Sequence, residues 1–138
     1  MRSLTVLWTV MALAALPLGG CHHHDDENTG HACQSVDQCY PGVDQSTLAG
    51  AAVCMDRVTG GYCTHNCVDD SDCCAVVGEC ETGFPQVCAP FESTGEYYCF
   101  LSCEGVADET TYCQDHANPA FACRSTGGGS TNRKVCVP

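Results

Sequence analysis

Cysteine is the residue type in this sequence with the most evident chemistry. Fifteen of the 138 residues are cysteines, about 11% and above the roughly 8–10% that marks a disulfide scaffold in a short secreted chain. Paired thiols persist as disulfides only in an oxidising compartment. No C-x2-C spacing occurs, which argues against a thioredoxin-type redox site and a zinc ribbon. We therefore expect the cysteines to be structural cross-links.

The spacing from Cys33 onward divides the cysteines into three units. CTHNC (63–67) and CFLSC (99–103) are both C-x3-C motifs that follow a tyrosine, and the units, at about 33–63, 67–99 and 103–136, meet there. The first two open with the same C-x5-C step, which C-x9-C replaces in the third. This pattern predicts an internal repeat with an insertion in the last copy. Each unit has an even number of cysteines and can close on itself: Cys33, Cys39, Cys54 and Cys63; Cys67, Cys73, Cys74, Cys80, Cys88 and Cys99; Cys103, Cys113, Cys123 and Cys136.

The connectivity within a unit is not fixed by spacing, because four cysteines allow three pairings. We expect the interleaved one, first to third and second to fourth. In the middle unit we expect the surplus pair to be Cys74 with Cys88.

The start of the chain has the composition of an export signal. A charged start at Met1 and Arg2 precedes an apolar run over 4–16, which has the length of a signal-peptide core and is too short to span a bilayer comfortably. The following Leu-Gly-Gly-Cys (18–21) resembles the lipobox of bacterial lipoproteins. The resemblance implies removal of residues 1–20 and lipidation of Cys21, which would anchor the protein in a membrane.

Parity independently supports the role of Cys21. Fifteen thiols cannot all pair with one another, whereas lipidation of one leaves fourteen. The alternative is an ordinary cleaved signal, with Cys21 free or bonded to another molecule. His22, rather than an aspartate, follows the anchor, and by resemblance to Gram-negative sorting this favours the outer membrane.

Residues 21–32 are polar, without apolar periodicity, and we interpret them as a flexible acidic and His-rich tether. His22, His23 and His24 stand beside three carboxylates, and imidazole is a good ligand for Zn²⁺ or Cu²⁺. Nothing in the sequence fixes their geometry. A solvated spacer is the favoured interpretation, metal capture is the alternative, and we expect no resident metal or cofactor.

The charge excludes some partners. The formal net charge is −12 and becomes −13 once residues 1–20, whose only charged side chain is Arg2, are removed. Nucleic acids would repel such a protein. Partners of opposite charge, glycans and metal ions stay open, and acidity alone also favours solubility.

Few other residues suggest chemistry. Asp69, Asp70 and Asp72 form an acidic cluster that lacks the EF-hand pattern, so we interpret it as an exposed turn rather than a Ca²⁺ site. His65 and the Asp115-His116 pair are interpreted as surface residues. No nucleophile with an acid or base partner is identifiable, and we expect no enzymatic activity.

The elements that position these residues are expected to be small. The sequence predicts a small disulfide-rich fold of short β-hairpins and loops, with little helix outside the signal peptide beyond a turn near 115–118. We expect an elongated chain of stapled units with almost no conventional core. Extended segments are expected at 51–55 and 86–89, turns at 41–42, 59–61, 83–85 and 127–129, and a hairpin loop at 125–132.

The run GYCTHNCVDDSDC (61–73) resembles repeats of cysteine-rich bacterial lipoproteins and, more loosely, the Dickkopf-type and EB-type modules of animal secreted proteins. The resemblance covers about 33–103 and implies a binding or structural role. We therefore expect a membrane-anchored, extracytoplasmic binding or structural module of the cell envelope, whose ligand would be a protein or a glycan.

Two alternatives remain. One is a protease inhibitor that presents Arg57 or Arg124, and the other is a metal-binding envelope protein that uses the tether. The aromatic residues are expected to pack against disulfides, with an exposed recognition patch as the alternative. These are Tyr62, Phe84, Phe91, Tyr97, Tyr98 and Phe100.

Overall fold

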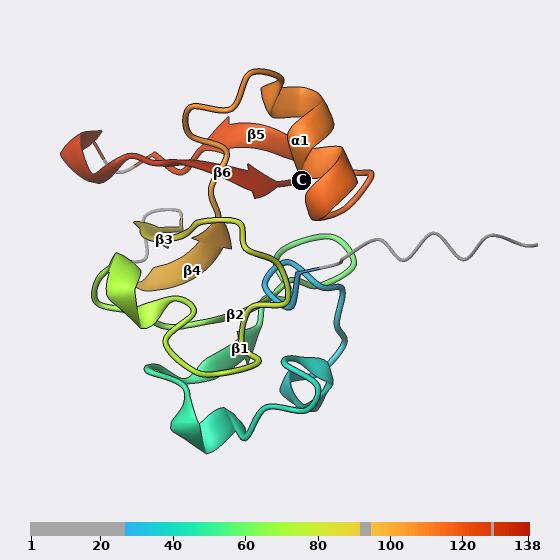
Figure 1. The fold of residues 1–138 in the computed structure, drawn as a ribbon, viewed down its shortest axis with the longest axis vertical. Helices are drawn as coiled ribbons and strands as arrows, with labels where there is room; N and C mark the ends of the chain where they lie inside the picture. Colours follow the sequence, from blue (N-terminus) through green and yellow to red (C-terminus); the bar gives the residue numbers. More distant parts are fainter. Residues whose placement is uncertain (1–26, 92–94, 128) are drawn as a thin grey trace, which may run out of the picture.

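The computed structural model describes residues 27–91, 95–127 and 129–138, and within them it contains three antiparallel hairpins (Figure 1). The expected small disulfide-rich fold is confirmed. In the described part of the chain, no helix is long and apolar enough to cross a membrane. The hairpins pair β1 (Ala52–Cys54) with β2 (Cys63–His65), β3 (Gln86–Pro90) with β4 (Tyr97–Leu101), and β5 (Ala122–Ser125) with β6 (Lys134–Val137). The helices are η1 (Val36–Gln38), η2 (Gln45–Thr47), η3 (Asp70–Asp72), α1 (Glu109–His116) and η4 (Gly129–Thr131).

Seven disulfides join the fourteen cysteines from Cys33 onward, and each lies within one unit. The interleaved order is the one that we expected, but the expected Cys74–Cys88 pair is wrong. Cys74 bonds to Cys80, six residues away, and Cys88 bonds to Cys67. The pairs are Cys33–Cys54, Cys39–Cys63, Cys67–Cys88, Cys73–Cys99, Cys74–Cys80, Cys103–Cys123 and Cys113–Cys136.

The disulfides attach each hairpin to the segment before it. In each unit the last two cysteines face each other across the hairpin, as Cys54 faces Cys63, but they do not bond to each other. Each bonds instead to a cysteine near a short helix, η1, η3 or α1. A two-stranded hairpin is marginal alone in water, so these bonds supply the order that strand pairing lacks.

Loop length sets how much each bond stabilises the fold. Six of the disulfides join residues 20 to 26 apart, whereas Cys74–Cys80 spans 6. The chain-entropy relation gives roughly 3 kcal/mol for a loop of the longer kind and about 2 kcal/mol for the short one. The short disulfide therefore contributes least to global stability.

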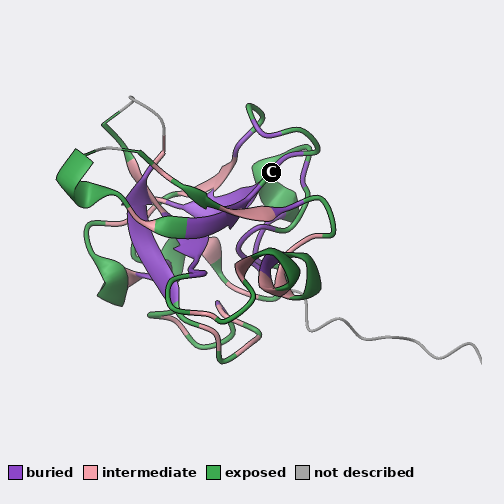
Figure 2. Ribbon diagram, turned by 90° about the horizontal axis from the view of Figure 1, so that it is seen from above, coloured by how far each residue is buried: buried purple, intermediate pink, exposed green. Residues whose placement is uncertain are grey.

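The three units stack along the long axis in chain order and share one hydrophobic cluster (Figure 1). The expectation of separate units with almost no core is wrong, because buried side chains from all three meet. Strands β2, β3, β4 and β6 carry most of the buried strand residues, whereas β1 and β5 are half-buried or exposed and the short helices are mostly exposed (Figure 2). The cluster comprises Met55, Val58 and Tyr62; Val87, Ala89, Phe100 and Leu101; Cys103, Cys113, Phe121, Val135, Cys136 and Val137.

Polar contacts also join the units. Arg133 of the third unit makes two hydrogen bonds to Glu104, of 2.9 and 3.0 Å, and two of 3.0 Å to Asp70 of the second unit. The hydrogen bond with Arg133 holds the pKa of Glu104 below its usual value. Thr64, which lies in β2 of the first hairpin, donates to the carbonyl of Cys99 at 2.6 Å. Directed hydrogen bonds and ion pairs thus join neighbouring units, in addition to the shared hydrophobic cluster.

Within the described part of the expected tether, residues 27–30 are buried against the domain and do not form a free spacer, whereas His31 and Ala32 are exposed. Glu27 and Thr29 are 2% and 0% exposed. The Glu27 carboxylate accepts a 2.7 Å bond from the backbone N–H of Glu81, and the Thr29 hydroxyl lies 3.0 Å from that of Tyr40. Residues 21–26, with Cys21, lie outside the described residues, as does the expected signal.

The predicted local elements are confirmed in part. Strands form within 51–55 and at 86–89, and the expected loop at 125–132 begins at Ser125, which is the last residue of β5 and pairs with Lys134 of β6. The turn at 59–61 needs glycine, since Gly61 has φ of 77° and a Cβ there would lie 1.8 Å from the carbonyl oxygen of Cys33. A helix spans Glu109–His116, whereas a turn near 115–118 was expected. Asp108 caps it, and the longer C-x9-C step, which ends at Cys113, provides its first five residues.

We expect Phe100→Ala to destabilise all three units together. Phe100 is fully buried in the shared cluster, and Phe-to-Ala replacements in cores cost about 3–5 kcal/mol. Urea denaturation should show a single transition at lower urea. Val77→Ala, at a residue 99% exposed, is the control and should change stability by less than about 0.5 kcal/mol. Hydrogen exchange that accelerates in 67–101 alone would contradict a shared core.

Candidate functional site

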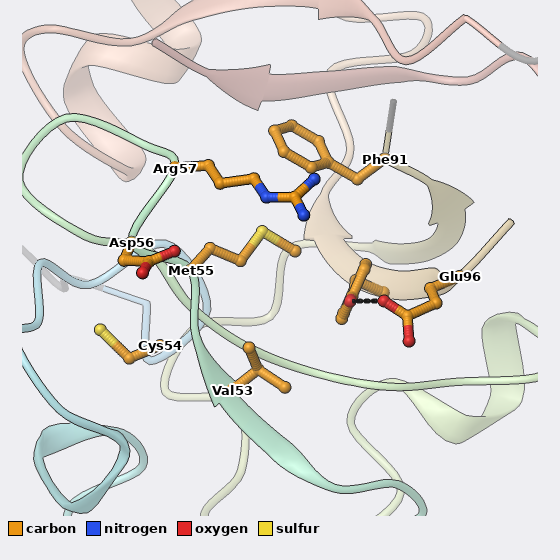
Figure 3. A pocket seen from close by; sticks show the side chains of 8 residues that line it. Val53, Cys54, Met55, Asp56, Arg57, Phe91 and Glu96 are labelled. Carbon is orange, nitrogen blue, oxygen red and sulfur yellow. Dashed lines mark hydrogen bonds between the residues drawn. The ribbon is translucent and has the colours of Figure 1, made fainter. Parts of the chain in front are cut away.

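A cavity of about 180 Å³ lies between the turn that follows β1 and the hairpin of β3 and β4 (Figure 3). It therefore opens where the first and second units meet. The lining combines apolar, aromatic and charged side chains: Val53, Cys54, Met55, Asp56, Arg57, Phe91, Glu96 and Tyr98.

Local structure fixes the walls of this cavity. The N–H of Met55 donates to the carbonyl of Tyr62 at 2.9 Å and closes the turn, while the Met55 side chain is buried in the shared cluster. On the opposite wall, Phe91 follows β3 directly, and its ring packs against Phe100 with centroids 5.8 Å apart. Both walls are thus continuous with the core, so the cavity is held open by packed side chains.

The charged groups lie around the mouth of the cavity. The guanidinium of Arg57 is directed toward the ring of Phe91 (Figure 3), and the Tyr98 hydroxyl donates to Glu96 at 2.5 Å. Burial raises the pKa of Tyr98, and the bond to Glu96 and the charge of Glu96 raise it further. Asn66 and the charge of Arg57 act in the opposite direction. The charges of Glu96 and Arg57 thus shift the pKa of the Tyr98 hydroxyl in opposite directions.

The lining combines groups of the kinds that bind ligands. Aromatic and thioether surfaces offer apolar contact, while Arg57, Asp56 and Glu96 provide one positive and two negative groups. Pockets of this mixed kind orient a ligand through a few polar groups on an apolar floor.

A second hollow, of about 210 Å³, lies between the N-terminal segment and the end of α1. Its lining consists of Gly30, His31, Ala32, Gln114, Ala117, Asn118 and Pro119. It lacks the aromatic walls and the carboxylates of the first cavity, which is therefore the stronger candidate.

His65, which we expected at the surface, is fully buried and lies 2.7 Å from the fully buried carboxylate of Glu79. Its Nδ1 faces the carbonyl oxygen of Asn66 at 2.8 Å and therefore carries a hydrogen. The ring of Tyr40 packs edge-on against the imidazole, and burial raises the pKa of this tyrosine. Histidine–carboxylate pairs occur in catalytic sites, but this pair lines neither cavity. Its position indicates a structural role.

Several residues singled out in the sequence meet at the first cavity. The structure brings together Arg57, Phe91 and Tyr98, whereas Tyr62 and Phe100 are fully buried and Phe84 and Tyr97 pack against hydrophobic clusters. Packing of the aromatics is thus confirmed. Sequence reasoning missed Met55, Asp56 and Glu96, which carry no motif.

The second arginine proposed for an inhibitor lies elsewhere. Arg124 is exposed, but it belongs to β5 and pairs with Val135 of β6. Arg57 is exposed in the turn after β1. Neither arginine lies at the centre of a long extended loop, the conformation that would insert into a protease cleft.

The acidic cluster is an exposed turn whose carboxylates have protein partners. Asp69 caps η3 by accepting from the N–H of Ser71, and Asp72 accepts from that of Val68 at 2.7 Å. Hydrogen bonds to Ser71 lower the pKa of Asp69. Asp70 binds Arg133.

Three close groups of potential metal ligands occur in the described part of the chain, and all consist of disulfide-bonded cysteines. These groups arise because two disulfides pack against each other in each unit. His22, His23 and His24 lie outside the described residues.

Asp115 and His116 end α1 without forming a site. Asp115 is exposed, and the imidazole of His116 packs on the rings of Phe84 and Tyr112, at 4.1 and 4.8 Å between centroids. Asp115 thus lies at the surface as expected, whereas His116 is half-buried.

Comparison with known proteins yields no match to a family model, to a curated protein or to a solved structure.

We expect opposite effects of Glu96→Gln and Arg57→Gln on the pKa of Tyr98. Loss of the Glu96 charge removes a cause that raises this pKa, and loss of the Arg57 charge removes one that lowers it. A pH titration of ¹³Cζ-labelled tyrosine by NMR would follow Tyr98. The pKa of Tyr112, raised by burial and by Glu27, should stay constant in both variants. Shifts of the same sign in both variants would contradict the geometry of this cavity.

Proposed function

We propose that this protein is an extracytoplasmic, lipid-anchored binding module of the bacterial cell envelope. In this proposal the lipid is attached to Cys21, and the anchoring membrane is the outer membrane. The cavity between the first two units receives part of a protein or glycan partner. The protein performs no catalysis of its own.

The disulfide pattern is the observation that carries the proposal. All fourteen cysteines from Cys33 to Cys136 bond to one another within their units. A reducing cytosol would not sustain seven such bonds. Because no partner remains within the chain for Cys21, the pairing leaves its thiol for the lipid that the Leu-Gly-Gly-Cys motif suggests.

The cavity supports a binding role, because it is built from rigid parts. Met55 and Val53 rise from one hairpin and Phe91 and Tyr98 from the next, and disulfides fix both hairpins. A pre-formed site binds without the entropic cost of ordering loops. Its two carboxylates and the acidity of the whole chain favour a partner with positive or neutral polar groups.

We expect intact mass spectrometry of the membrane-associated protein to show a chain that begins at Cys21, carries acyl groups and has no alkylatable thiol under native conditions. Cys21→Ser is the matched control, since it retains the seven disulfides and loses the lipid. It should carry no acyl groups. An unprocessed wild-type chain in the cytoplasm, or several reactive thiols in native protein, would contradict the proposal.

We expect a photo-crosslinking amino acid in place of Arg57 to capture the partner in cells. The same replacement of Arg124 is the matched control, because Arg124 is also an exposed arginine but lies outside the cavity. Adducts should form from position 57 and not from position 124. Equal yields at the two positions, or none at either, would contradict a role of the cavity in binding.

A further inference from the structure

The Cys74–Cys80 disulfide is the most accessible of the seven. Cys74 is exposed and Cys80 is half-buried, whereas each of the other six disulfides contains at least one buried cysteine. Thiol–disulfide exchange requires a thiolate to reach a sulfur atom directly. Since the bond also closes a loop of only six residues, its opening releases little chain.

The loop between these cysteines is held by hydrogen bonds that do not depend on the disulfide. The Glu79 carboxylate accepts from the N–H of Cys74 at 2.7 Å and from that of Val76 at 2.9 Å. The same carboxylate bonds to His65 in the protein interior. Glu79, which directly precedes Cys80, is fully buried, and its side chain binds the backbone of Cys74. Glu79 therefore holds both ends of the loop.

The N-terminal segment adds a second attachment. Nδ2 of Asn28 donates to the carbonyl oxygens of Gly78 and Glu79, at 3.0 and 2.8 Å. Cys74 itself has φ of 67°, a left-handed conformation that is uncommon outside glycine. The surrounding contacts thus determine the shape of the loop, and they would keep two free thiols close together after reduction.

We propose that Cys74–Cys80 is a reversible exchange site for a protein dithiol. A thiolate of the dithiol attacks Sγ of Cys74, the Cys74–Cys80 bond breaks, and Cys80 leaves as a thiolate that takes a proton from water. The second thiol of the partner, deprotonated by solvent, attacks the mixed disulfide and displaces Cys74, which is protonated in turn.

The exchange is balanced. Two electrons pass from the partner to the loop, Cys74 and Cys80 become thiols, and the partner becomes a disulfide. An oxidised partner reverses both steps. The six disulfides of the interleaved pattern stay intact throughout, so the fold persists. This site is separate from the cavity and does not depend on the proposed function.

The test is the order of reduction in the full native chain. Existing thiols are first blocked with N-ethylmaleimide, the protein is exposed to increasing dithiothreitol, and new thiols are trapped with iodoacetamide for intact mass and peptide mapping. We expect a species with two new labels, on Cys74 and Cys80, that forms at least about tenfold faster than any with four. Its far-ultraviolet spectrum should match that of the oxidised protein.

Variants separate exchange from general fragility. Cys74→Ser/Cys80→Ser should abolish the two-label species, and Val77→Ala, in the same loop, should leave it unchanged. Glu79→Gln should slow re-oxidation of the pair, because the thiols are less well held. First labelling at any other pair, or full reduction without a two-label species, overturns the proposal. Both outcomes are measured on the unmodified native chain, so they do not depend on whether the variants fold.

Discussion

The structure depends on one constraint, which is that the two cysteines facing each other across a hairpin do not bond to each other. Cys88 and Cys99 are direct neighbours across β3 and β4, yet each reaches back to a cysteine beside η3. A bond between them would only have reinforced a hairpin that already exists. The observed bonds instead fix the hairpin to a separate segment, and this creates the surfaces on which Phe100 and its neighbours pack.

The sequence was sufficient for the features that depend on cysteine parity. Even counts in each unit predicted bonds that close within the units, although they do not by themselves select the interleaved order, and turn signals around a short extended segment predicted the strand at 86–89. Parity could not identify the partner of Cys74, because a bond to Cys80 and a bond to Cys88 both leave an even number of cysteines in the unit. The choice depends on the conformation at Cys74 and on Glu79, which folds the loop back on itself.

Burial of polar residues was the main feature that sequence could not predict. Glu27, Thr29, His65 and Glu79 are all polar, and composition places such residues at the surface. They are buried because each meets a partner distant in sequence, as Glu79 meets His65. The cavity presented the same difficulty: Arg57 and the aromatics were candidates on chemical grounds, but only the stacking of two units brings Arg57, Phe91 and Tyr98 together.

Burial of Glu27 also determines how far from a bilayer the domain can stand. Six residue steps separate Cys21 from Glu27, and a fully extended chain of that length reaches about 20 Å. If Cys21 carries the lipid proposed above, this short connection would keep the loop around Glu81, which binds Glu27, near the phospholipid headgroups. Partners would have to come to this layer of the envelope, because the module cannot extend far out to meet them.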